Sequence, residues 1–319
     1  MQAFQVTAFD APPALTEVAL PRPGPGEVTL RIAACGLNFA DLLMMEGKYQ
    51  DTPPPPFTMG LEVAGEVMAV GDGVDLAPGT RVACFAGQGG LAEAGVFPAA
   101  ACVPIPDAMP FDQAAGFLVA YGTSHLALTH RARLQPGERL LVLGAAGGVG
   151  LTAVELGARI GAEVIAVARG AGKLAVAKSA GATHLIDSDA GDIRDAVKAL
   201  GGADVVYDAV GGAQFTAALR ATNPEGRILV IGFASGDIPQ IPANLLLVKN
   251  ISVLGLYWGG YARIRPQVVR DSLSALMAMY ARGEIRPHVG ATYPLARAAE
   301  ALELLRARKS TGKVVVTMG

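Results

Sequence analysis

Six short apolar segments alternate with helix-patterned segments in the chain from Glu138 onward. The apolar segments have the length of strands and are hydrophobic almost throughout, as strands covered on both faces are; they begin at Arg139, Glu163, Thr183, Asp204, Arg227 and Ile251. Helix-patterned segments occupy residues 148–160, 171–180 and 192–200. Such alternation is typical of parallel βαβ units. It predicts an α/β fold with a six-stranded, doubly wound parallel sheet, the Rossmann arrangement.

The chain before this region has a different pattern. Segments such as EVTLRIAACG and TRVACF are short strands separated by Gly and Pro turns, without a long helix between them, and they predict a β-rich domain. After the sixth strand we expect helices over 266–282 and 295–306, and then a final strand, KVVVTM, which returns to the first domain. The predicted division is therefore 1–122 plus 262–319 for the β-rich domain and 123–261 for the Rossmann domain.

Composition narrows the function classes. Of the 319 residues, 51% are hydrophobic and 17% are charged, with a net charge of −2, which disfavours disorder and a nucleic-acid partner. No apolar stretch reaches the roughly 18 residues that a membrane span needs, and the first residues lack the pattern of a signal peptide. Cys35, Cys84 and Cys102 are an odd number without close pairing in the sequence. We therefore expect a reducing compartment and a cytoplasmic protein without membrane or nucleic-acid partners.

A glycine-rich turn, GAAGGVG at 144–150, follows the first predicted strand and precedes an amphipathic helix. Glycines let the backbone approach a pyrophosphate, and the helix N-terminus supplies N–H groups and positive potential. The predicted contacts are Ala146, Gly147, Gly148 and Val149. The alternative interpretation is an ordinary glycine-rich βα turn without a ligand.

The end of the second predicted strand indicates which dinucleotide binds. NAD enzymes usually place Asp or Glu there to bind the ribose hydroxyls, but this chain reads AVARGAGK. Arg169 and Lys173 bring positive charge where the 2′-phosphate of NADP would lie. The alternative is that both are solvated surface charges. We predict NADPH as the cofactor.

Several motifs are similar to those of one known family. They are the signature from Gly137-Glu138 to Gly150, GLNFADLLMMEGKY at 36–49, YGTSHLAL from Tyr121, DAVG from Asp208 and IGFASG from Ile231. With these motifs the chain resembles the zinc-independent, ζ-crystallin-like quinone oxidoreductases of the medium-chain dehydrogenase/reductase superfamily, over nearly its whole length. Glu155 and Ala158 depart from the family signature, along the helix and away from the phosphate turn.

The resemblance implies a GroES-like β-rich domain, with the active site in the cleft between it and the nucleotide domain. It implies that Lys173 and Arg308 bind the 2′-phosphate and that Thr123 lies beside the nicotinamide. Ser188 stands where some members have a tyrosine on the adenine side. Backbone groups expected near the nicotinamide carboxamide belong to Gly232, Phe233, Ser235, Leu256, Tyr257 and Trp258.

The positions of the zinc ligands in related alcohol dehydrogenases carry different residues here. Alignment on the family motifs puts Asn38 at the Cys position and Leu61 at the His position. We predict no metal. Without zinc, simple alcohols become poor substrates, because their oxidation requires strong stabilisation of a localised oxygen charge. A quinone or an α,β-unsaturated carbonyl spreads that charge over a conjugated system, for which hydrogen-bond donors suffice.

The predicted reaction is hydride transfer from NADPH to a quinone, followed by protonation. Tyr49 is the candidate acid, since it matches a tyrosine of related enoyl-thioester reductases; the alternative is a packing residue. Asn38 could fix the nicotinamide ribose or polarise the carbonyl, and Asp41 could orient Asn38. The Asn-x-x-Asp spacing is also that of a simple helix cap.

Two other functions stay open at this point. One is reduction of enoyl-thioesters or 2-alkenals, and the other is NADPH binding without catalysis, as in a crystallin-like structural protein. The last predicted strand, ISVLGLYW, is apolar and would leave an exposed sheet edge. We therefore expect a homodimer that pairs the edges near Ile251 to Trp258.

Overall fold

The computed structural model describes residues 1–319, which form two compact units. Unit 1 comprises Met1–Val119 and Arg286–Gly319, and unit 2 comprises Ala120–Ile285. Unit 1 is therefore discontinuous in the sequence, and its second segment contains the chain's last strand.

The second boundary of unit 2 lies later in the chain than residue 262, the position expected from the sequence. The intervening helix, α10 (Pro266–Ala281), is part of unit 2. Its Ser272 Oγ lies 2.8 Å from His125 Nδ1, and its Leu276 side chain is fully buried. Tertiary packing of this helix therefore extends the unit.

Unit 2 is built on one six-stranded sheet, in which every neighbouring pair is parallel. The spatial order is β11-β10-β9-β12-β13-β14. The strands are β9 (Arg139–Leu143), β10 (Glu163–Ala168), β11 (His184–Asp187), β12 (Ala203–Asp208), β13 (Thr222–Val230) and β14 (Ser252–Gly255). The predicted doubly wound sheet is confirmed.

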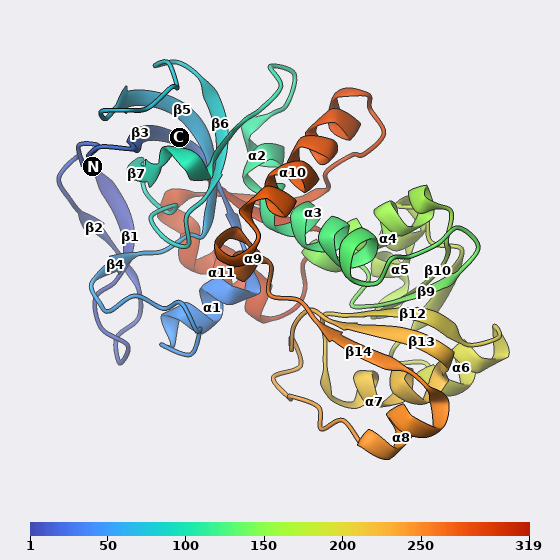
Figure 1. Cartoon of the computed structure of the whole chain (residues 1–319). Helices are drawn as coiled ribbons and strands as arrows, with labels where there is room; N and C mark the ends of the chain where they lie inside the picture. Colours follow the sequence, from blue (N-terminus) through green and yellow to red (C-terminus); the bar gives the residue numbers. More distant parts are fainter. The chain divides into compact units, whose positions relative to one another are not determined.

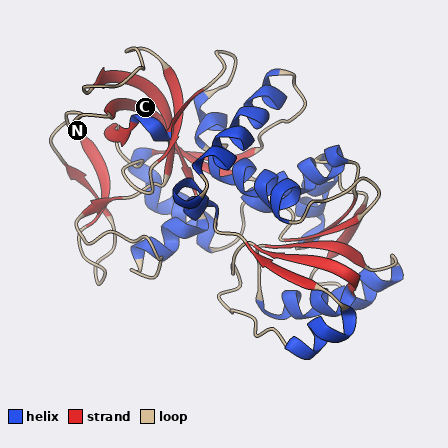
Figure 2. Cartoon of the chain, viewed as in Figure 1, coloured by secondary structure: helices blue, strands red, loops and turns tan.

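Helices lie on both faces of this sheet (Figures 1 and 2). The helices of unit 2 are α3 (Leu118–His125), continued by a π-helical turn at Leu126–Arg131, α4 (Gly148–Ile160), α5 (Gly170–Ser179), α6 (Ile193–Ala199), α7 (Gly212–Ala221), α8 (Ala243–Lys249), α9 (Trp258–Ile264) and α10. A Cβ on Gly157 of α4 would lie 2.4 Å from Leu140 Cδ2. The absence of a side chain there lets α4 pack directly on β9.

Unit 1 contains a seven-stranded sheet and a three-stranded sheet. Its strands are β1 (Gln2–Val6), β2 (Ala14–Glu17), β3 (Glu27–Leu37), β4 (Phe57–Thr58), β5 (Glu62–Val70), β6 (Arg81–Phe85), β7 (Ala94–Pro98), β8 (Cys102–Pro104), β15 (Val289–Pro294) and β16 (Lys313–Thr317). Its helices are α1 (Phe39–Met45), α2 (Phe111–Ala115) and α11 (Ala298–Arg306), with 3-10 turns at Ala99–Ala101 and Leu295–Arg297. The final strand β16 pairs antiparallel with β3, as the sequence predicts.

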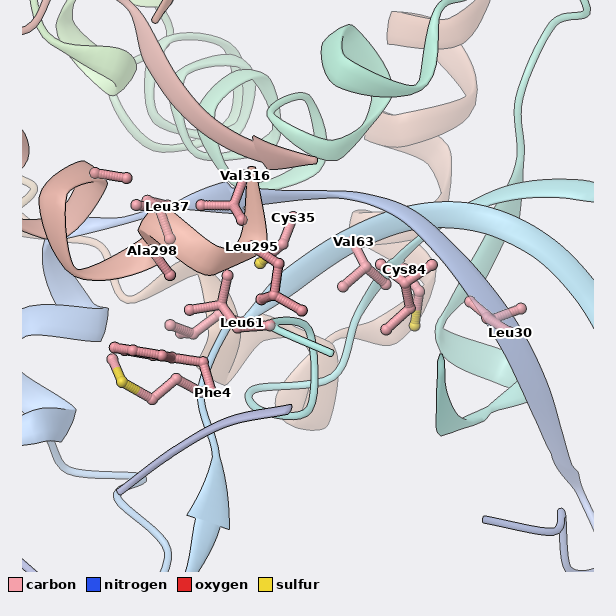
Figure 3. Packing of buried hydrophobic residues seen from close by; sticks show 14 of the residues in the cluster. Phe4, Leu30, Cys35, Leu37, Leu61, Val63, Cys84, Leu295, Ala298 and Val316 are labelled. Atoms are coloured by element: carbon pink, nitrogen blue, oxygen red, sulfur yellow. The ribbon is translucent and has the colours of Figure 1, made fainter. Parts of the chain in front are cut away.

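The core of unit 1 joins segments from both ends of the chain. Figure 3 shows Phe4 near the N-terminus with Leu37, Leu61, Leu295 and Val316 in one buried cluster. Each of these side chains is at most 9% exposed. Burial of apolar area is the main favourable term in folding. Here it fixes the positions of β3, β5 and β16, the strands that carry or adjoin the polar residues of the candidate site in unit 1.

Candidate active site

The sheet of unit 2 reverses its winding direction between β9 and β12. These strands are neighbours, with Leu143 opposite Asp208, so the turns that follow them lie side by side. A Cβ on Gly144 would lie 3.0 Å from Val210 Cγ2. Ligands of open α/β sheets bind outside the carboxyl ends of the strands at such a reversal point.

The glycine-rich turn has the backbone of a phosphate-binding loop. Gly144 has a φ of +70°, and its carbonyl accepts a hydrogen bond from Gly147 N–H at 3.0 Å. A Cβ on Gly150 would lie 2.1 Å from Gly144 O, so a side chain is excluded there. Helix α4 begins at Gly148, where its first N–H groups have no partner within the helix. Gly148 and Val149 are half-exposed, so this N-terminus can bind an anion.

A second loop packs against the turn after β12. The Asp208 carboxylate is fully buried and accepts hydrogen bonds from Val210 and Gly211 N–H at 2.8 and 2.9 Å. Burial raises the pKa of Asp208. Ser235 N–H donates to Val210 O at 2.8 Å, and a Cβ on Gly211 would lie 3.1 Å from Phe233 Cδ1. The residues expected near the carboxamide thus lie beside the carboxyl end of β12.

Two cations lie together after β10. Burial and the neighbouring Arg169 guanidinium lower the pKa of Lys173. Arg169 Nε lies 3.4 Å from Asp189 Oδ2, in an exposed ion pair. Like charges in proximity favour a bound anion, since it would relieve their repulsion.

Asp187 of β11 is an acid that the sequence analysis did not include in the cofactor site. Asp187 ends β11 opposite Ala168, and its Oδ1 accepts from the N–H groups of Gly170 and Asp189, both at 3.1 Å. These two N–H groups lower its pKa. Ser188 N–H donates to Ala168 O at 3.0 Å, so Ser188 also lies at this edge. Backbone N–H groups therefore already bind the Asp187 carboxylate, and Arg169 supplies a positive charge beside it.

The remaining predicted residues of unit 2 lie near β14 and on α3. Leu256 N–H donates to Val230 O at 3.1 Å, and Tyr257 precedes α9. A Cβ on Gly122 would lie 2.8 Å from the Trp258 indole, so this ring packs directly on α3, where Thr123 is also buried. The Trp258 side chain therefore packs against α3.

In unit 1 a buried polar cluster surrounds Asn38. Lys313 Nζ donates to Asn38 Oδ1 at 2.8 Å and to Glu62 Oε1 at 2.6 Å. Asn38 Nδ2 donates to Glu62 Oε1 at 3.0 Å and to Gly36 O at 3.2 Å. Glu62 Oε2 accepts from Val119 N–H at 3.0 Å. Because an ammonium group can only donate, Lys313 determines which way the Asn38 amide faces.

Asp41, in the first turn of helix α1, hydrogen-bonds to Asn38. Its Oδ2 accepts from Asn38 N–H at 2.7 Å, which is one half of a capping box. The Asn38 side chain, at the N-cap position of α1, also faces Glu62 and Lys313. Burial raises the pKa of Asp41 to about 7, against the hydrogen bond from Asn38 and the charge of Lys313. Asp41 is only 1% exposed.

Tyr49 and Arg308 lie elsewhere in unit 1. Tyr49 is half-buried and packs against the core, and Thr52 Oγ1 donates to its carbonyl at 2.6 Å. Arg308 is exposed just after α11, with a φ of +54°. Leu61 is buried in the core.

Sequence reasoning missed Glu62 and Lys313. Both are charged residues at the first position of a largely apolar strand, and that pattern was the available signal. No group of three or more His, Cys, Asp or Glu side chains is placed to hold a metal ion. None of the helices has the length and apolar character required for a membrane crossing.

Comparison with known proteins identifies the family. The alcohol dehydrogenase GroES-like domain matches residues 24–107, and the zinc-binding dehydrogenase family matches 148–276. Quinone oxidoreductase-like protein 2 of Mus musculus is 42% identical over 323 residues, which cover 99% of this chain and 92% of that protein. The chain belongs to the zinc-independent, quinone oxidoreductase-like group of medium-chain dehydrogenases/reductases.

Two solved structures of this superfamily share the fold over the whole chain. The quinone oxidoreductase of Thermus thermophilus, also solved with NADPH, has a TM-score of 0.89 and 36% identity, with 100% of both chains covered. The Escherichia coli quinone oxidoreductase in complex with NADPH has a TM-score of 0.91 and 27% identity, also with complete coverage. The chain is therefore an oxidoreductase of a superfamily that binds nicotinamide cofactors. The resemblance stated from its motifs is confirmed.

Proposed function

We propose that this oxidoreductase reduces quinones with NADPH, by hydride transfer to the conjugated acceptor and without a metal. The observation that carries the proposal is the carboxyl edge of the unit 2 sheet. There the half-exposed N-terminus of α4 and the cations Arg169 and Lys173 provide two places for negative charge. The E. coli and T. thermophilus relatives solved with NADPH support this choice of cofactor.

The residues at this edge fit a phosphorylated dinucleotide. The missing side chains at Gly147 and Gly150 leave the turn backbone accessible to a pyrophosphate. Lys173 would bind the 2′-phosphate together with Arg169, and Arg308 is proposed as a further ligand from unit 1. Residues proposed to bind the remaining parts are Thr123, Ala146, Gly148, Val149, Ser188, Gly232, Phe233, Ser235, Leu256, Tyr257 and Trp258. Reduced nicotinamide, when bound, supplies a hydride.

The hydrogen bonds of Asn38 favour one of its two predicted roles. Both hydrogens of its Nδ2 are engaged, by Gly36 O and by Glu62, and its Oδ1 accepts from Lys313. Asn38 therefore has no N–H left to donate to a substrate carbonyl. This supports a contact with a ribose hydroxyl of the cofactor over polarisation of a substrate carbonyl. Asp41 would act as a positioning residue through Asn38 N–H.

The choice of acceptor follows from the chemistry at two positions. Asn38 and Leu61 replace the thiolate and imidazole that a catalytic zinc would require. An acceptor that delocalises its developing charge needs only hydrogen-bond donors and a proton source. We assign Tyr49 as the proton donor, on its match to the tyrosine of related reductases.

We also propose that two copies pair through β14. This strand is the last in its sheet, and Val253 and Leu254 on it are only half-buried. Leu247 and Val248 of the preceding helix α8 are 77% and 65% exposed. An apolar edge of this kind is normally covered. Light scattering at micromolar concentration should give the mass of a dimer, and a monomer would contradict the pairing.

An acceptor panel at saturating NADPH tests the reaction. We expect 1,4-naphthoquinone to have the highest kcat/KM, above crotonyl-thioester and 2-alkenals. A higher value for either of the latter would reassign the enzyme as an enoyl-thioester or alkenal reductase. If NADPH binds but is not oxidised above background with any acceptor, a non-catalytic NADPH-binding protein is the correct description.

A further inference from the structure

Two of the three cysteines are cross-strand neighbours in unit 1. Cys84 lies in β6, and Cys102 begins β8, which is the edge strand of the sheet; the two residues are directly opposite in the antiparallel ladder. Both are free thiols. The two cysteines are far apart in the sequence, and the register of β6 and β8 places them opposite each other.

The hydrogen bonds of the ladder define which kind of pair this is. Ile105 N–H donates to Arg81 O at 3.1 Å, so these opposed residues form a hydrogen-bonded pair. The two kinds of pair alternate along an antiparallel ladder, and the next position holds Pro104, which has no N–H to give. Two steps further, Cys84 and Cys102 form a non-hydrogen-bonded pair. Such pairs have Cα atoms about 4.5 Å apart and side chains in close contact, and disulfides span Cα separations of about 4.4–6.8 Å.

The surroundings make the two thiols unequal. Cys84 is fully buried in the core of unit 1 (Figure 3), whereas Cys102 is half-buried at its border. Interaction with Cys102 and burial raise the pKa of Cys84, and interaction with Cys84 lowers the pKa of Cys102. The Cys102 Sγ itself donates to Pro98 O at 3.6 Å. Cys35, by contrast, is separated from Cys84 by Val63 of the intervening strand β5, and burial raises the pKa of Cys35 well above the usual range. Thiolates are the reactive form, so Cys102 is the thiol that reacts first.

We propose that Cys84 and Cys102 are a redox modification site, which hydroperoxides convert reversibly to a disulfide. The Cys102 thiolate attacks one oxygen of hydrogen peroxide, so that an S–O bond forms, the O–O bond breaks and hydroxide leaves, taking up a proton as water. The Cys84 thiol then attacks the sulfur of the resulting sulfenic acid, loses its proton and expels the second water. Two thiols lose two hydrogens, and one peroxide becomes two waters. This site does not depend on the proposed activity with quinones.

Peptide mass spectrometry of the whole protein tests the proposal. The reduced protein is treated with hydrogen peroxide, unfolded in an alkylating agent and digested. We expect a peptide linked between Cys84 and Cys102, lighter by two hydrogens than the two thiol peptides, while Cys35 is alkylated. Free thiols should fall from the three of the sequence to one, and dithiothreitol should restore them. Alkylated Cys84 beside Cys102 oxidised to sulfinic acid would overturn the proposal, as would a linkage to Cys35.

Three variants keep the test decisive. Cys35→Ala should form the same link, and Cys102→Ser should leave Cys84 alkylated after peroxide. Cys84→Ala preserves an apolar side chain in the core, and in it Cys102 should stop at a sulfenic acid that dimedone traps. If Cys102→Ser still loses the Cys84 thiol at the parent rate, Cys102 is not the first thiol to react and the assignment fails.

Discussion

The Lys313→Met substitution would remove one charge from the buried cluster around Asn38. It deletes the ammonium that lies 2.6 Å from Glu62 Oε1 and 2.8 Å from Asn38 Oδ1. The Lys313 and Glu62 side chains are 8% and 1% exposed, so water cannot replace the lost partner. Breaking a buried ion pair by removing one partner costs about 3–5 kcal/mol, because the other charge stays buried. We expect a loss of that size in the free energy of unfolding.

Urea denaturation followed by far-UV circular dichroism measures this effect. Fluorescence is less suitable, because the single tryptophan, Trp258, lies in unit 2. The matched control is Arg31→Met, which breaks the Arg31–Glu66 pair between β3 and β5. That pair has the same 2.6 Å separation, but its side chains are 67% and 36% exposed. The control should cost at most about 1 kcal/mol. A Lys313→Met variant as stable as this control would refute the reasoning.

A double variant separates stability from positioning. Adding Glu62→Gln to Lys313→Met removes the uncompensated charge, and the carbonyl of the introduced amide can still accept from Val119 N–H. The nitrogen of that amide then faces Asn38, which can form a hydrogen bond with it only if its own amide turns over. We expect Lys313→Met to raise the KM for NADPH, because it releases the Asn38 amide that Lys313 orients. In the double variant much of the lost stability should return, whereas the KM should stay above that of the parent. Recovery of both quantities together would show that the orientation of Asn38 does not matter.

Three further predictions concern single residues. Because the pKa of Asp41 is about 7 in the fold and 3.8 for an unperturbed aspartate side chain, the native state holds one more proton than the unfolded chain in that window. This group should therefore lower the free energy of unfolding by about 1.4 kcal/mol per pH unit as the pH rises from 4 to 7. Asp41→Asn keeps an oxygen acceptor for Asn38 N–H, and it should remove this pH dependence from urea midpoints measured across the range. An unchanged slope would contradict the assignment. Tyr49→Phe should lower kcat about a hundredfold as loss of a general acid does, and unchanged turnover on every active acceptor would remove the role. Lys173→Ala should raise the KM for NADPH about tenfold and leave that for NADH unchanged, whereas Lys178→Ala, at the exposed far end of α5, should change neither; equal effects on both cofactors would exclude a 2′-phosphate contact.

The sheet of unit 2 could be predicted because a short stretch of sequence is enough to indicate each of its strands. Each strand from Arg139 to Gly255 contains a short apolar run of its own, and the glycine turn at 144–150 carries its geometry in its own residues. The return of β16 to unit 1 also followed from the pattern, since KVVVTM had no place in a completed sheet.

The clusters of unit 1 could not be predicted in this way. Lys313 and Glu62 meet across a sequence separation of 251 residues, and only the pairing of β16, β3 and β5 brings them together. The opposition of Cys84 and Cys102 depends on strand register, which a shift of one residue would abolish. Local patterns give the strands, but not which side chains face each other across them.

The steady-state oxidation of the two nicotinamide cofactors by 1,4-naphthoquinone tests the central claim most directly. The account predicts that NADPH is oxidised in equal amount to the quinone reduced. It also predicts that kcat/KM for NADPH exceeds that for NADH by about tenfold or more, the effect of one charge-assisted contact to the 2′-phosphate. No oxidation above background, or a preference for NADH, would contradict the proposed reaction and its cofactor.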